Sequence, residues 1–398
     1  MAKVLLGVSG GIAAYKAAAI VRELVKRGDE VRVVMTRGAQ EFITPLTLQV
    51  VSQNAVATDL FDTTQEHEIG HIELARWPDV ILLAPATAQL IAQLAGGMAS
   101  DLLTTILLAT RAPVVVAPAM NTQMYLHPAV QRNLQTLRDD GHHLVEPDAG
   151  VLACQEVGPG RLPDPPVLLA AIDRAIGPNL LQGRRVLISA GPTREALDPA
   201  RFISNPSTGK MGYALARAAH TLGAEVTLVS GPVALDTPPG ARRLDVITAQ
   251  QMADTVWAEA PSHDLVIMCA AVADWRPKDP SATKRAKSEM TGTLELTRNP
   301  DILARLGEQF GPHTDGPGPT IVGFAAESHD VEARATAKLA RKQAHLIIAN
   351  LIGGPSSAFG SDRSSATIIH HAQGALARLG PDTKEALALE IMRALTSV

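Results

Sequence analysis

Residues 204–213, SNPSTGKMGY, bring hydroxyl, amide and ammonium side chains together with two glycines, just before a helical pattern. The pair Gly209–Lys210 occurs in phosphate-binding P-loops. A P-loop also needs glycine five positions before that pair and serine or threonine after it. Ser204 and Met211 occupy those two positions. The P-loop interpretation is therefore excluded, and another chemistry must explain this polar turn.

A second group of small and polar residues follows four apolar runs in the first half of the chain. Ser9 and Gly10 lie in GVSGGIAAYK, where glycine lets the backbone approach a ligand and a helix N-terminus offers donors to a phosphate. Thr36 ends the second run, APAT (84–87) the third and PAMN (118–121) the fourth. Such tips on parallel strands predict a crevice for a phosphorylated planar cofactor, although a tight turn without a ligand has the same composition.

Three side chains able to do chemistry lie near these runs: His71 in HIELARW, Asn121 in PAMN and Cys154 in ACQEVGPGR. A single histidine is usually a surface or core residue, and a single cysteine is usually a small buried hydrophobe. Cys154, however, lies in a Gly/Pro-rich segment without a strand or helix pattern. This favours a mobile lid for the segment around Cys154.

The elements that must position these residues form two similar series. At 398 residues, 46% hydrophobic and 19% charged, the chain suits two domains of about 150–200 residues. Val/Ile/Leu runs without polar alternation, separated by helical patterns, predict parallel strands covered on both faces. The pattern weakens at 161–182 and then begins again. We therefore expect an α/β protein with two doubly wound, Rossmann-like or flavodoxin-like parallel-sheet domains in tandem, 1–180 and 181–398.

Composition narrows the function classes. A net charge of −4 without a long basic block argues against a nucleic-acid binder. Two cysteines, Cys154 and Cys269, cannot form a disulfide framework, which favours a reducing compartment. The apolar N-terminus is interrupted by glycines, and no uncharged apolar stretch reaches the length of a membrane span. We expect no membrane partner, no zinc site and a cytoplasmic location.

Several long motifs now carry a family resemblance. GVSGGIAAYK, HIELARW, APATAQLIAQLAGGMASDLL, PAMN and ACQEVGPGR resemble the flavin-dependent cysteine decarboxylases. ISAGPTREALDPARFISNPSTGKMGYALA, AAVADW and VGFAAES resemble phosphopantothenate–cysteine ligase. In this order, and nearly end to end, the chain resembles the bifunctional phosphopantothenoylcysteine decarboxylase/phosphopantothenate–cysteine ligases of bacterial coenzyme A biosynthesis.

For the first half, the resemblance implies an FMN-dependent decarboxylase that converts 4′-phospho-N-pantothenoylcysteine to 4′-phosphopantetheine. Oxidation of the substrate thiol toward a thioaldehyde would supply the electron sink that CO₂ loss needs. His71 matches the family's active-site histidine, Asn121 the residue that holds the substrate carboxylate, and Cys154 the proton-donating lid cysteine. Gln89 and Gln155 stand where the family usually has asparagine and glycine. The expected FMN-binding residues are Ser9, Gly10, Thr36, Ala84, Thr87 and Met120.

For the second half, the resemblance implies that CTP activates 4′-phosphopantothenate as an acyl-cytidylate, which the amino group of cysteine then attacks. SNPSTGKMGY would present backbone N–H groups to phosphate or acyl-phosphate oxygens. Asn205 matches the asparagine that handles the acyl-cytidylate, and Lys284 matches the catalytic lysine, although KRAK (284–287) is also what a solvated loop looks like. The expected substrate- and CTP-binding residues are Ala270, Asp274, Lys284, Pro300, Asp301, Ile302, Phe324, Lys338 and Lys342. Mg²⁺ is expected to accompany CTP, held mainly by its phosphates.

The family's decarboxylase halves assemble as trimers with FMN at the subunit contact and its ligase halves as dimers, so the resemblance also implies a homo-oligomer, up to a dodecamer. Three alternatives remain. A nicotinamide-dependent dehydrogenase lacks the motif G-x-G-x-x-G with a later acidic residue. A regulatory flavoprotein without chemistry would be favoured by loss of His71 or Cys154, and both are present. A protein with only one active half is the third.

Overall fold

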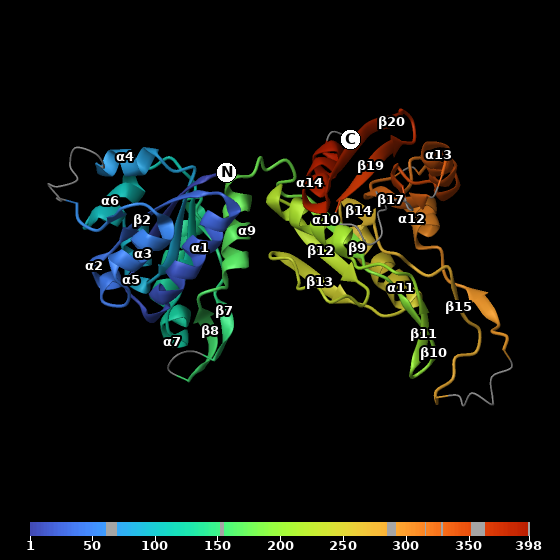
Figure 1. Ribbon diagram of the computed structural model, residues 1–398, viewed down its shortest axis with the longest axis horizontal. Coiled ribbons are helices and arrows are strands. Elements are labelled where there is room, and N and C mark those ends of the chain that lie inside the picture. The colour runs from blue at the N-terminus through green and yellow to red at the C-terminus, as the bar shows by residue number, and fades with distance from the viewer. Residues whose placement is uncertain are drawn as a thin grey trace. The chain divides into compact units, whose positions relative to one another are not determined.

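The structure, a computed structural model, describes residues 1–60, 70–151, 155–284, 292–314, 316–327, 329–351 and 363–396. The chain folds into two compact units, Met1–Gly177 and Pro178–Val398 (Figure 1). The division falls three residues before the boundary expected from the sequence. No helix among the described residues is both long and apolar enough to cross a membrane.

The first unit is built on a six-stranded sheet in the order β3-β2-β1-β4-β5-β6, with every neighbouring pair parallel. Its strands are β1 (Lys3–Val8), β2 (Glu30–Met35), β3 (Val56–Ala57), β4 (Val80–Ala86), β5 (Val114–Pro118) and β6 (His143–Leu144). This is the doubly wound order, in which the chain reverses its winding between β1 and β4. Ligands bind such sheets at the carboxyl ends of the two strands beside that reversal.

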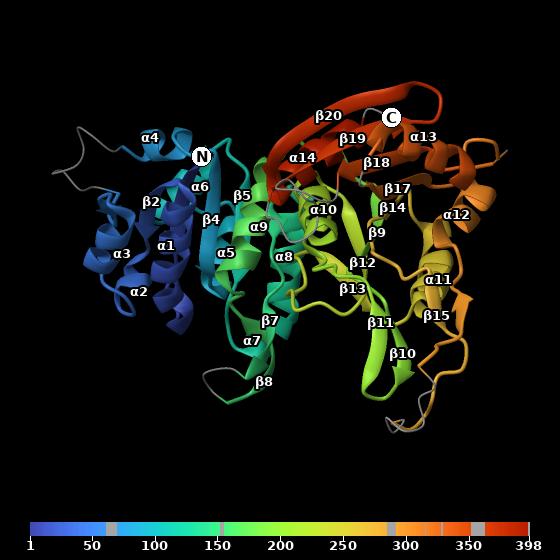
Figure 2. The ribbon, with the colours of Figure 1, turned by 45° about the vertical axis from the view of Figure 1, so that its right-hand side comes forward.

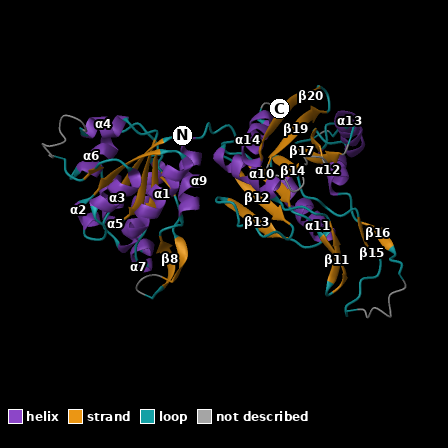
Figure 3. Cartoon of the chain, in the orientation of Figure 1, coloured by secondary structure: helices purple, strands orange, loops and turns teal. Residues whose placement is uncertain are grey.

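Helices cover both faces of this sheet because its strands are apolar on both sides. Val4, Leu6 and Val8 of β1 join one core cluster, and Leu5 joins the other, as the period of two in a strand requires. The helical elements are η1 (Ile12–Lys16), α1 (Ala17–Arg27), α2 (Arg37–Gln40), α3 (Pro45–Ser52), α4 (His71–Arg76), α5 (Ala88–Ala95), α6 (Leu102–Ala109), α7 (Thr122–Leu126), α8 (Pro128–Asp139) and α9 (Pro165–Ile176). The antiparallel hairpin β7 (Asp148–Val151) and β8 (Val157–Arg161) lies beside α7 (Figure 3).

The second unit repeats the doubly wound plan and then extends it. Its eight-stranded sheet has the order β13-β12-β9-β14-β17-β18-β19-β20. The strands are β9 (Arg185–Ala190), β12 (Glu225–Ser230), β13 (Ala241–Asp245), β14 (Leu265–Met268), β17 (Thr320–Glu327), β18 (Leu346–Leu351), β19 (Arg363–His370) and β20 (Gly374–Thr383). The first six strands in this order, through β18, are mutually parallel, whereas β19 and β20 pair antiparallel. The sheet is therefore mixed, and the expectation of a wholly parallel second sheet missed these two strands.

Helices again cover both faces of this sheet. One core cluster includes residues of α10 (Lys210–Thr221) and α14 (Lys384–Leu395), and the other includes residues of α11 (Ala249–Glu259), α12 (Ile302–Phe310) and α13 (Val331–Lys342). The 3₁₀ turn η2 (Ala260–Ser262) follows α11. Two hairpins, β10 (Arg194–Asp198) with β11 (Arg201–Ser204) and β15 (Trp275–Pro277) with β16 (Leu296–Arg298), extend together away from the sheet (Figure 2).

Candidate active sites

The first unit has a cavity of about 770 Å³ at the carboxyl ends of β1, β4 and β5, within the range of about 300–1,000 Å³ usual for ligand pockets. It lies at the winding reversal between β1 and β4. Gly10 belongs to its lining, and a Cβ there would lie 2.6 Å from the carbonyl carbon of Gly38. Only glycine allows this close approach of two backbone loops. The remaining lining residues are Gly11, Ile12, Ala13, Tyr15, Lys16, Thr87, Ala88, Gln89, Ala119, Met120, Asn121, Met124, Val151, Gly160, Arg161 and Leu162.

Ser9 fixes the geometry of this strand-end loop from inside the protein. Its side chain is 2% exposed. The hydroxyl donates to the carbonyl oxygen of Pro85 (2.7 Å) and accepts from the backbone N–H of Thr87 (2.9 Å). Its single proton is thus committed to a protein acceptor, so Ser9 joins the ends of β1 and β4. The donors that this loop can turn toward an anion are backbone N–H groups.

Both predicted FMN-binding threonines are helix caps. The Thr36 hydroxyl accepts from Ala39 N–H at the start of α2, and the Thr87 hydroxyl accepts from Leu90 N–H at the start of α5. Thr87 lines the cavity, as does Met120. Thr36 and Ala84 are not among the lining residues, and Ala84 is buried within β4.

Asn121 lies in the cavity wall as the N-cap of α7. Its Oδ1 accepts from the backbone N–H groups of Gln123 (2.8 Å) and Met124 (3.4 Å). This leaves the amide nitrogen to face outward, and Nδ2 donates to Glu156 Oε2 at 2.6 Å. Helix capping therefore orients the amide so that its N–H groups are presented to a carboxylate.

The described residues of one chain do not bring His71 to this cavity. His71 is the first residue of α4 and is absent from the cavity lining. Cys154 lies outside the described residues. The neighbouring Gln155 has φ +65°, in the left-handed region that glycine adopts without strain.

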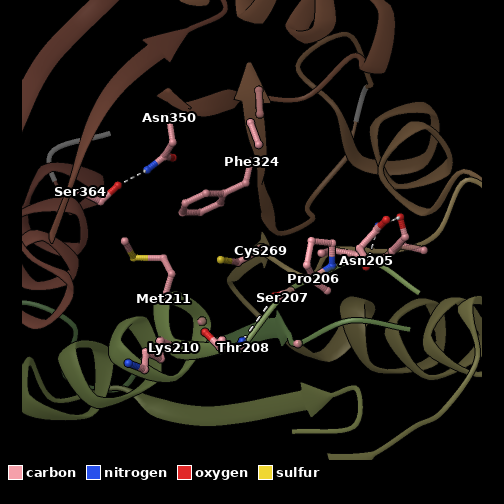
Figure 4. A pocket seen from close by; sticks show the side chains of 18 of the residues that line it. Asn205, Pro206, Ser207, Thr208, Lys210, Met211, Cys269, Phe324, Asn350 and Ser364 are labelled. Atoms are coloured by element: carbon pink, nitrogen blue, oxygen red, sulfur yellow. Dashed lines mark hydrogen bonds between the residues drawn. The ribbon is translucent and has the colours of Figure 1, made fainter. Parts of the chain in front are cut away.

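The second unit has a corresponding cavity of about 550 Å³ at the carboxyl ends of β9, β14, β17 and β18 (Figure 4). It brings together several residues singled out in the sequence: Asn205, Ala270, Asp274, Phe324 and Lys338. The other lining residues are Gly191, Pro206, Ser207, Thr208, Gly209, Lys210, Met211, Gly212, Cys269, Ala271, Val272, Ala325, Ala326, Asn350, Ser364 and Lys384.

The SNPSTGKMGY segment forms one wall of this cavity. Gly209 is the N-cap of α10, and its φ of +77° is one that other residues rarely adopt. A Cβ at this position would also lie 2.9 Å from Val233 Cγ1. The Asn205 amide nitrogen donates to the carbonyl oxygens of Ala271 and Val272, both at 3.2 Å. This ties the loop to the segment after β14 and places the N-terminus of α10 at the cavity.

Asp274 and NPDIL (299–303) meet through Asn299. Its backbone N–H donates to the carbonyl oxygen of Asp274 (2.9 Å), and its Nδ2 donates to that of Ala273 (2.8 Å). Pro300, Asp301 and Ile302 follow directly but do not line the cavity. Asn299 is not among the site residues predicted from the sequence, although it directly precedes Pro300, which is.

The two lysines of α13 have different surroundings. Lys338 Nζ donates to the carbonyl oxygen of Phe324 at 2.8 Å, and burial lowers the Lys338 pKa, while the carboxylate of Glu327 opposes this effect. Lys342 pairs with Asp301 outside the cavity. Burial disfavours the Asp301 carboxylate, but its hydrogen bonds, first that from Lys342, lower its pKa overall. Lys338 therefore lies in the wall of the cavity, whereas the ion pair of Lys342 with Asp301 joins α13 to the start of α12.

Lys284 is exposed and absent from the lining of this cavity. The rest of KRAK, including Lys287, lies outside the described residues. Among the described residues there is no group of three or more His, Cys, Asp or Glu that could hold a metal ion.

Three cavity residues escaped the sequence analysis: Asn350, Ser364 and Lys384. All are buried, and Lys384 is only 5% exposed at the start of α14. The signal for Asn350 was present, because a polar amide in the apolar run HLIIANLI must find partners if it is buried. The signal for Lys384 was weak, since lysine at a helix start is ordinarily exposed.

Comparison with known proteins supports a two-part architecture. Residues 1–177 match the family model described as Flavoprotein, and residues 181–398 match that of the DNA/pantothenate metabolism flavoprotein C-terminal domain. The chain is 50% identical over 392 residues to the coenzyme A biosynthesis bifunctional protein CoaBC of Vibrio parahaemolyticus, covering 98% of this chain and 96% of that one. It is 53% identical over 368 residues to that of Vibrio cholerae, covering 92% and 91%. A crystal structure of the C-terminal domain of CoaBC is 41% identical and covers 55% of this chain and 97% of that chain, with a TM-score of 0.46.

Proposed function

Because the chain belongs to the family of coenzyme A biosynthesis bifunctional proteins, we propose that its two units catalyse consecutive steps. The second unit ligates cysteine to 4′-phosphopantothenate, converting CTP to CMP and pyrophosphate through an acyl-cytidylate. The first unit removes CO₂ from the product, 4′-phospho-N-pantothenoylcysteine, and yields 4′-phosphopantetheine. The observation that carries this proposal is the pair of cavities, each at the winding reversal of its own sheet.

FMN is the cofactor that we propose for the first cavity, in keeping with the match to the flavoprotein family. The cavity volume suits a planar ring system, and the close approach of Gly10 to Gly38 leaves backbone N–H groups near the start of η1 for a phosphate. Ser9 holds this loop in place, and Thr87 and Met120 line the cavity. When bound, FMN would supply the oxidation and reduction of the substrate sulfur-bearing carbon that decarboxylation requires.

Asn121 is the proposed anchor for the substrate carboxylate. Its amide N–H group already binds a carboxylate, that of Glu156, at 2.6 Å. A substrate carboxylate would take the same donor, and Glu156 would then have to give up its contact. Orientation of the leaving carboxylate is this residue's role, since CO₂ departs only when the breaking bond is correctly aligned.

His71 and Cys154 complete the proposed decarboxylase site, as base or electrostatic partner and as proton donor. Since His71 does not line the cavity of its own chain, we propose that it serves the cavity of a neighbouring copy in a trimer. Exposed apolar side chains at the rim of the cavity support such a contact: Ile12, Tyr15, Met124 and Val151 are all largely exposed.

In the second cavity, the N-terminus of α10 and Lys338 provide positive potential for phosphate groups. Asn205, beside the segment after β14, is proposed to position the acyl-cytidylate. CTP would contact Ala270, Asp274 and Phe324 directly. This wall of the cavity would be supported by Lys342 and by NPDIL (299–303). Mg²⁺ would be held mainly by the CTP phosphates. Lys284 is exposed and lies between β15 and β16 in the chain. It would stabilise the charge on the α-phosphate of CTP at a dimer contact.

A protein with an active ligase and a silent decarboxylase is the second candidate, and one observation favours it. Gln155 occupies the left-handed region next to Cys154, at a cost of about 1–2 kcal/mol for a residue other than glycine. This strain opposes the backbone conformation that Gln155 itself adopts. Flavin absorbance without CO₂ release would identify this candidate.

The deciding experiment measures pyrophosphate release by the full chain with 4′-phosphopantothenate, cysteine and Mg²⁺, comparing CTP with ATP. We expect release with CTP that requires phosphopantothenate, followed by 4′-phosphopantetheine formation by the flavin-loaded protein. No release with either nucleotide would refute the ligase half. We place the reaction in the cytoplasm, because the proposed role of Cys154 requires a reduced thiol.

A further inference from the structure

The amide of Asn121, in the wall of the first cavity, has a fixed orientation. Its Oδ1 caps α7 by accepting from the backbone N–H groups of Gln123 (2.8 Å) and Met124 (3.4 Å). A backbone N–H group can only donate, so the amide cannot turn by half a rotation without losing the cap. Nδ2 must therefore point away from the helix, and it donates to Glu156 Oε2 at 2.6 Å.

The carboxylate of Glu156 is held on Asn121 by a contact that can be exchanged. The Glu156 side chain is exposed, and Asn121 is the only side chain that binds its carboxylate among the residues that the structure describes. Water hydrates an exposed carboxylate at little cost, so leaving Asn121 costs Glu156 one charge-assisted hydrogen bond and no burial of charge. The contact is therefore favourable and still reversible.

The strand that follows Glu156 keeps this carboxylate within reach of the amide. That strand, β8, lies beside α7 (Figure 3). The backbone N–H of Met120 donates to the carbonyl oxygen of Gly160 at 3.0 Å, and a Cβ at Gly160 would lie 2.2 Å from the carbonyl oxygen of Met120. β8 is thus docked closely on the cavity wall. Rotation of the Glu156 side chain releases Asn121 while β8 stays in place.

A second carboxylate at this amide would meet electrostatic repulsion. An amide NH₂ group has two N–H donors, so its geometry alone would allow two acceptors. Two carboxylates on one nitrogen would stand side by side and repel each other. The two cations of the cavity lining, Lys16 and Arg161, are paired with Asp164 instead. The Asn121 amide therefore accommodates one carboxylate at a time.

We propose that Glu156 is an internal competitor of the substrate, which occupies the Asn121 amide until the carboxylate of a substrate displaces it. This inference rests on the proposed decarboxylase function. A ligand without a carboxylate leaves Glu156 in place. After CO₂ has left, the product has no carboxylate, and Glu156 returns to the amide. Glu156 thus weakens the substrate-bound state relative to the state after CO₂ loss, a difference in binding that favours decarboxylation.

The test compares two unreactive ligands by calorimetric titration of the flavin-loaded full chain. 4′-Phospho-N-pantothenoylserine keeps the carboxylate but has no thiol to oxidise, and 4′-phospho-N-pantothenoylethanolamine has hydrogen in place of that carboxylate. Glu156→Ala should lower the Kd of the serine analogue about fivefold, because the internal carboxylate no longer reduces the fraction of protein with a receptive amide. The Kd of the ethanolamine analogue should stay the same. An unchanged or raised Kd of the serine analogue, or an equal gain for both ligands, would overturn the proposal.

Three further variants separate competition from a general effect of charge. Glu156→Gln should give a smaller gain for the serine analogue, since its amide oxygen still accepts from Asn121 but carries no charge. Asp148→Asn is the matched control, because it removes a negative charge at the other end of the same hairpin, opposite Arg161, and should give no gain.

In an Asn121→Ala background, Glu156→Ala should no longer tighten binding of the serine analogue. A gain that persists in this background, or an equal gain in Asp148→Asn, would contradict the assignment. Failure of the unaltered, flavin-loaded protein to decarboxylate 4′-phospho-N-pantothenoylcysteine would instead refute the proposed function itself.

Discussion

Replacement of Asn121 by aspartate separates the structural and catalytic roles of this residue in the proposed decarboxylase. In the folded protein, Oδ1 caps α7 and Nδ2 meets the carboxylate of Glu156 at 2.6 Å. Aspartate caps a helix as well as asparagine does. Asn121→Asp therefore keeps the cap, but it replaces the side-chain donor with a second negatively charged acceptor. The fold should persist while the affinity for a carboxylate is lost.

The magnitude follows from two contributions. Loss of a hydrogen bond to a charged group costs about 1.5–3 kcal/mol. Two unit charges about 4 Å apart repel by about 4 kcal/mol at an effective dielectric constant of about 20, but Asn121 is half-buried and Glu156 is exposed, so solvent screens most of this repulsion. The hydrogen bond alone predicts a decrease of about 10- to 150-fold in kcat/KM for decarboxylation, and we take this as the lower bound.

The assay is formation of 4′-phosphopantetheine from 4′-phospho-N-pantothenoylcysteine by the flavin-loaded protein, with pyrophosphate release by the ligase unit as the internal control. Thermal unfolding should change little for Asn121→Asp, whereas Asn121→Ala should lose about 1 kcal/mol with its helix cap. A second control, Glu156→Gln, keeps the donor on Asn121 and should remain active. Decarboxylation by Asn121→Asp at the unaltered rate would show that the amide does not hold the substrate carboxylate.

Further predictions concern both units. Cys154→Ser should block release of 4′-phosphopantetheine but leave ligation intact, and full turnover by this variant would remove the thiol from the mechanism. Asn205→Asp should stall the ligase with acyl-cytidylate bound, which quenched-flow analysis would detect; unchanged amide formation would count against that role. Burial lowers the pKa of Lys338 in the folded protein. At pH values between the pKa of the folded state and that of the unfolded state, the unfolded state therefore binds more protons, and the stability of the protein rises with pH in that window. Lys338→Met should therefore raise the free energy of unfolding at neutral pH, by an increment that shrinks as pH rises through this window. The same variant should lose ligase activity. A stabilisation that does not change with pH would show that burial of the charge is not its cause. Removal of divalent cations with a chelator should abolish pyrophosphate release but not decarboxylation of supplied substrate, and equal loss of both would place the metal elsewhere.

The doubly wound strands could be predicted because a strand buried on both faces must be apolar throughout. β4 and β5 are buried along their whole length, and β9 is buried after its first residue. β19 alternates buried and partly exposed positions, and β20 is mostly exposed, so neither has a continuous apolar run. A search for such runs passes over both strands. The helical stretch after β1 begins as the 3₁₀ turn η1 and continues as α1, since the glycines before Ile12 favour a tight start.

Topology also explains which parts of the sites the sequence could indicate. In a parallel sheet, residues that follow neighbouring strands meet at one edge, and Gly10, Thr87 and Asn121 accordingly line one cavity. His71 and Lys284 lie on segments whose positions are not determined by the order of the strands in the sheet. Their motifs identify them by resemblance alone, and neither residue lines either of the two cavities described above.

Among the buried polar residues, the hydrogen bonds that each atom makes are more informative about its role than the residue type is. Ser9 has its donor and an acceptor position matched within the fold, and Glu195, 3% exposed, accepts from the backbone N–H of Ala249 at 2.9 Å. Both are buried for structural reasons. Asn350 resembles them in burial and differs in one atom, because its Oδ1 has no hydrogen-bond donor among the described residues. Sequence can show that a polar residue will be buried, but only the folded arrangement of its neighbours shows which of its atoms find a hydrogen-bond partner.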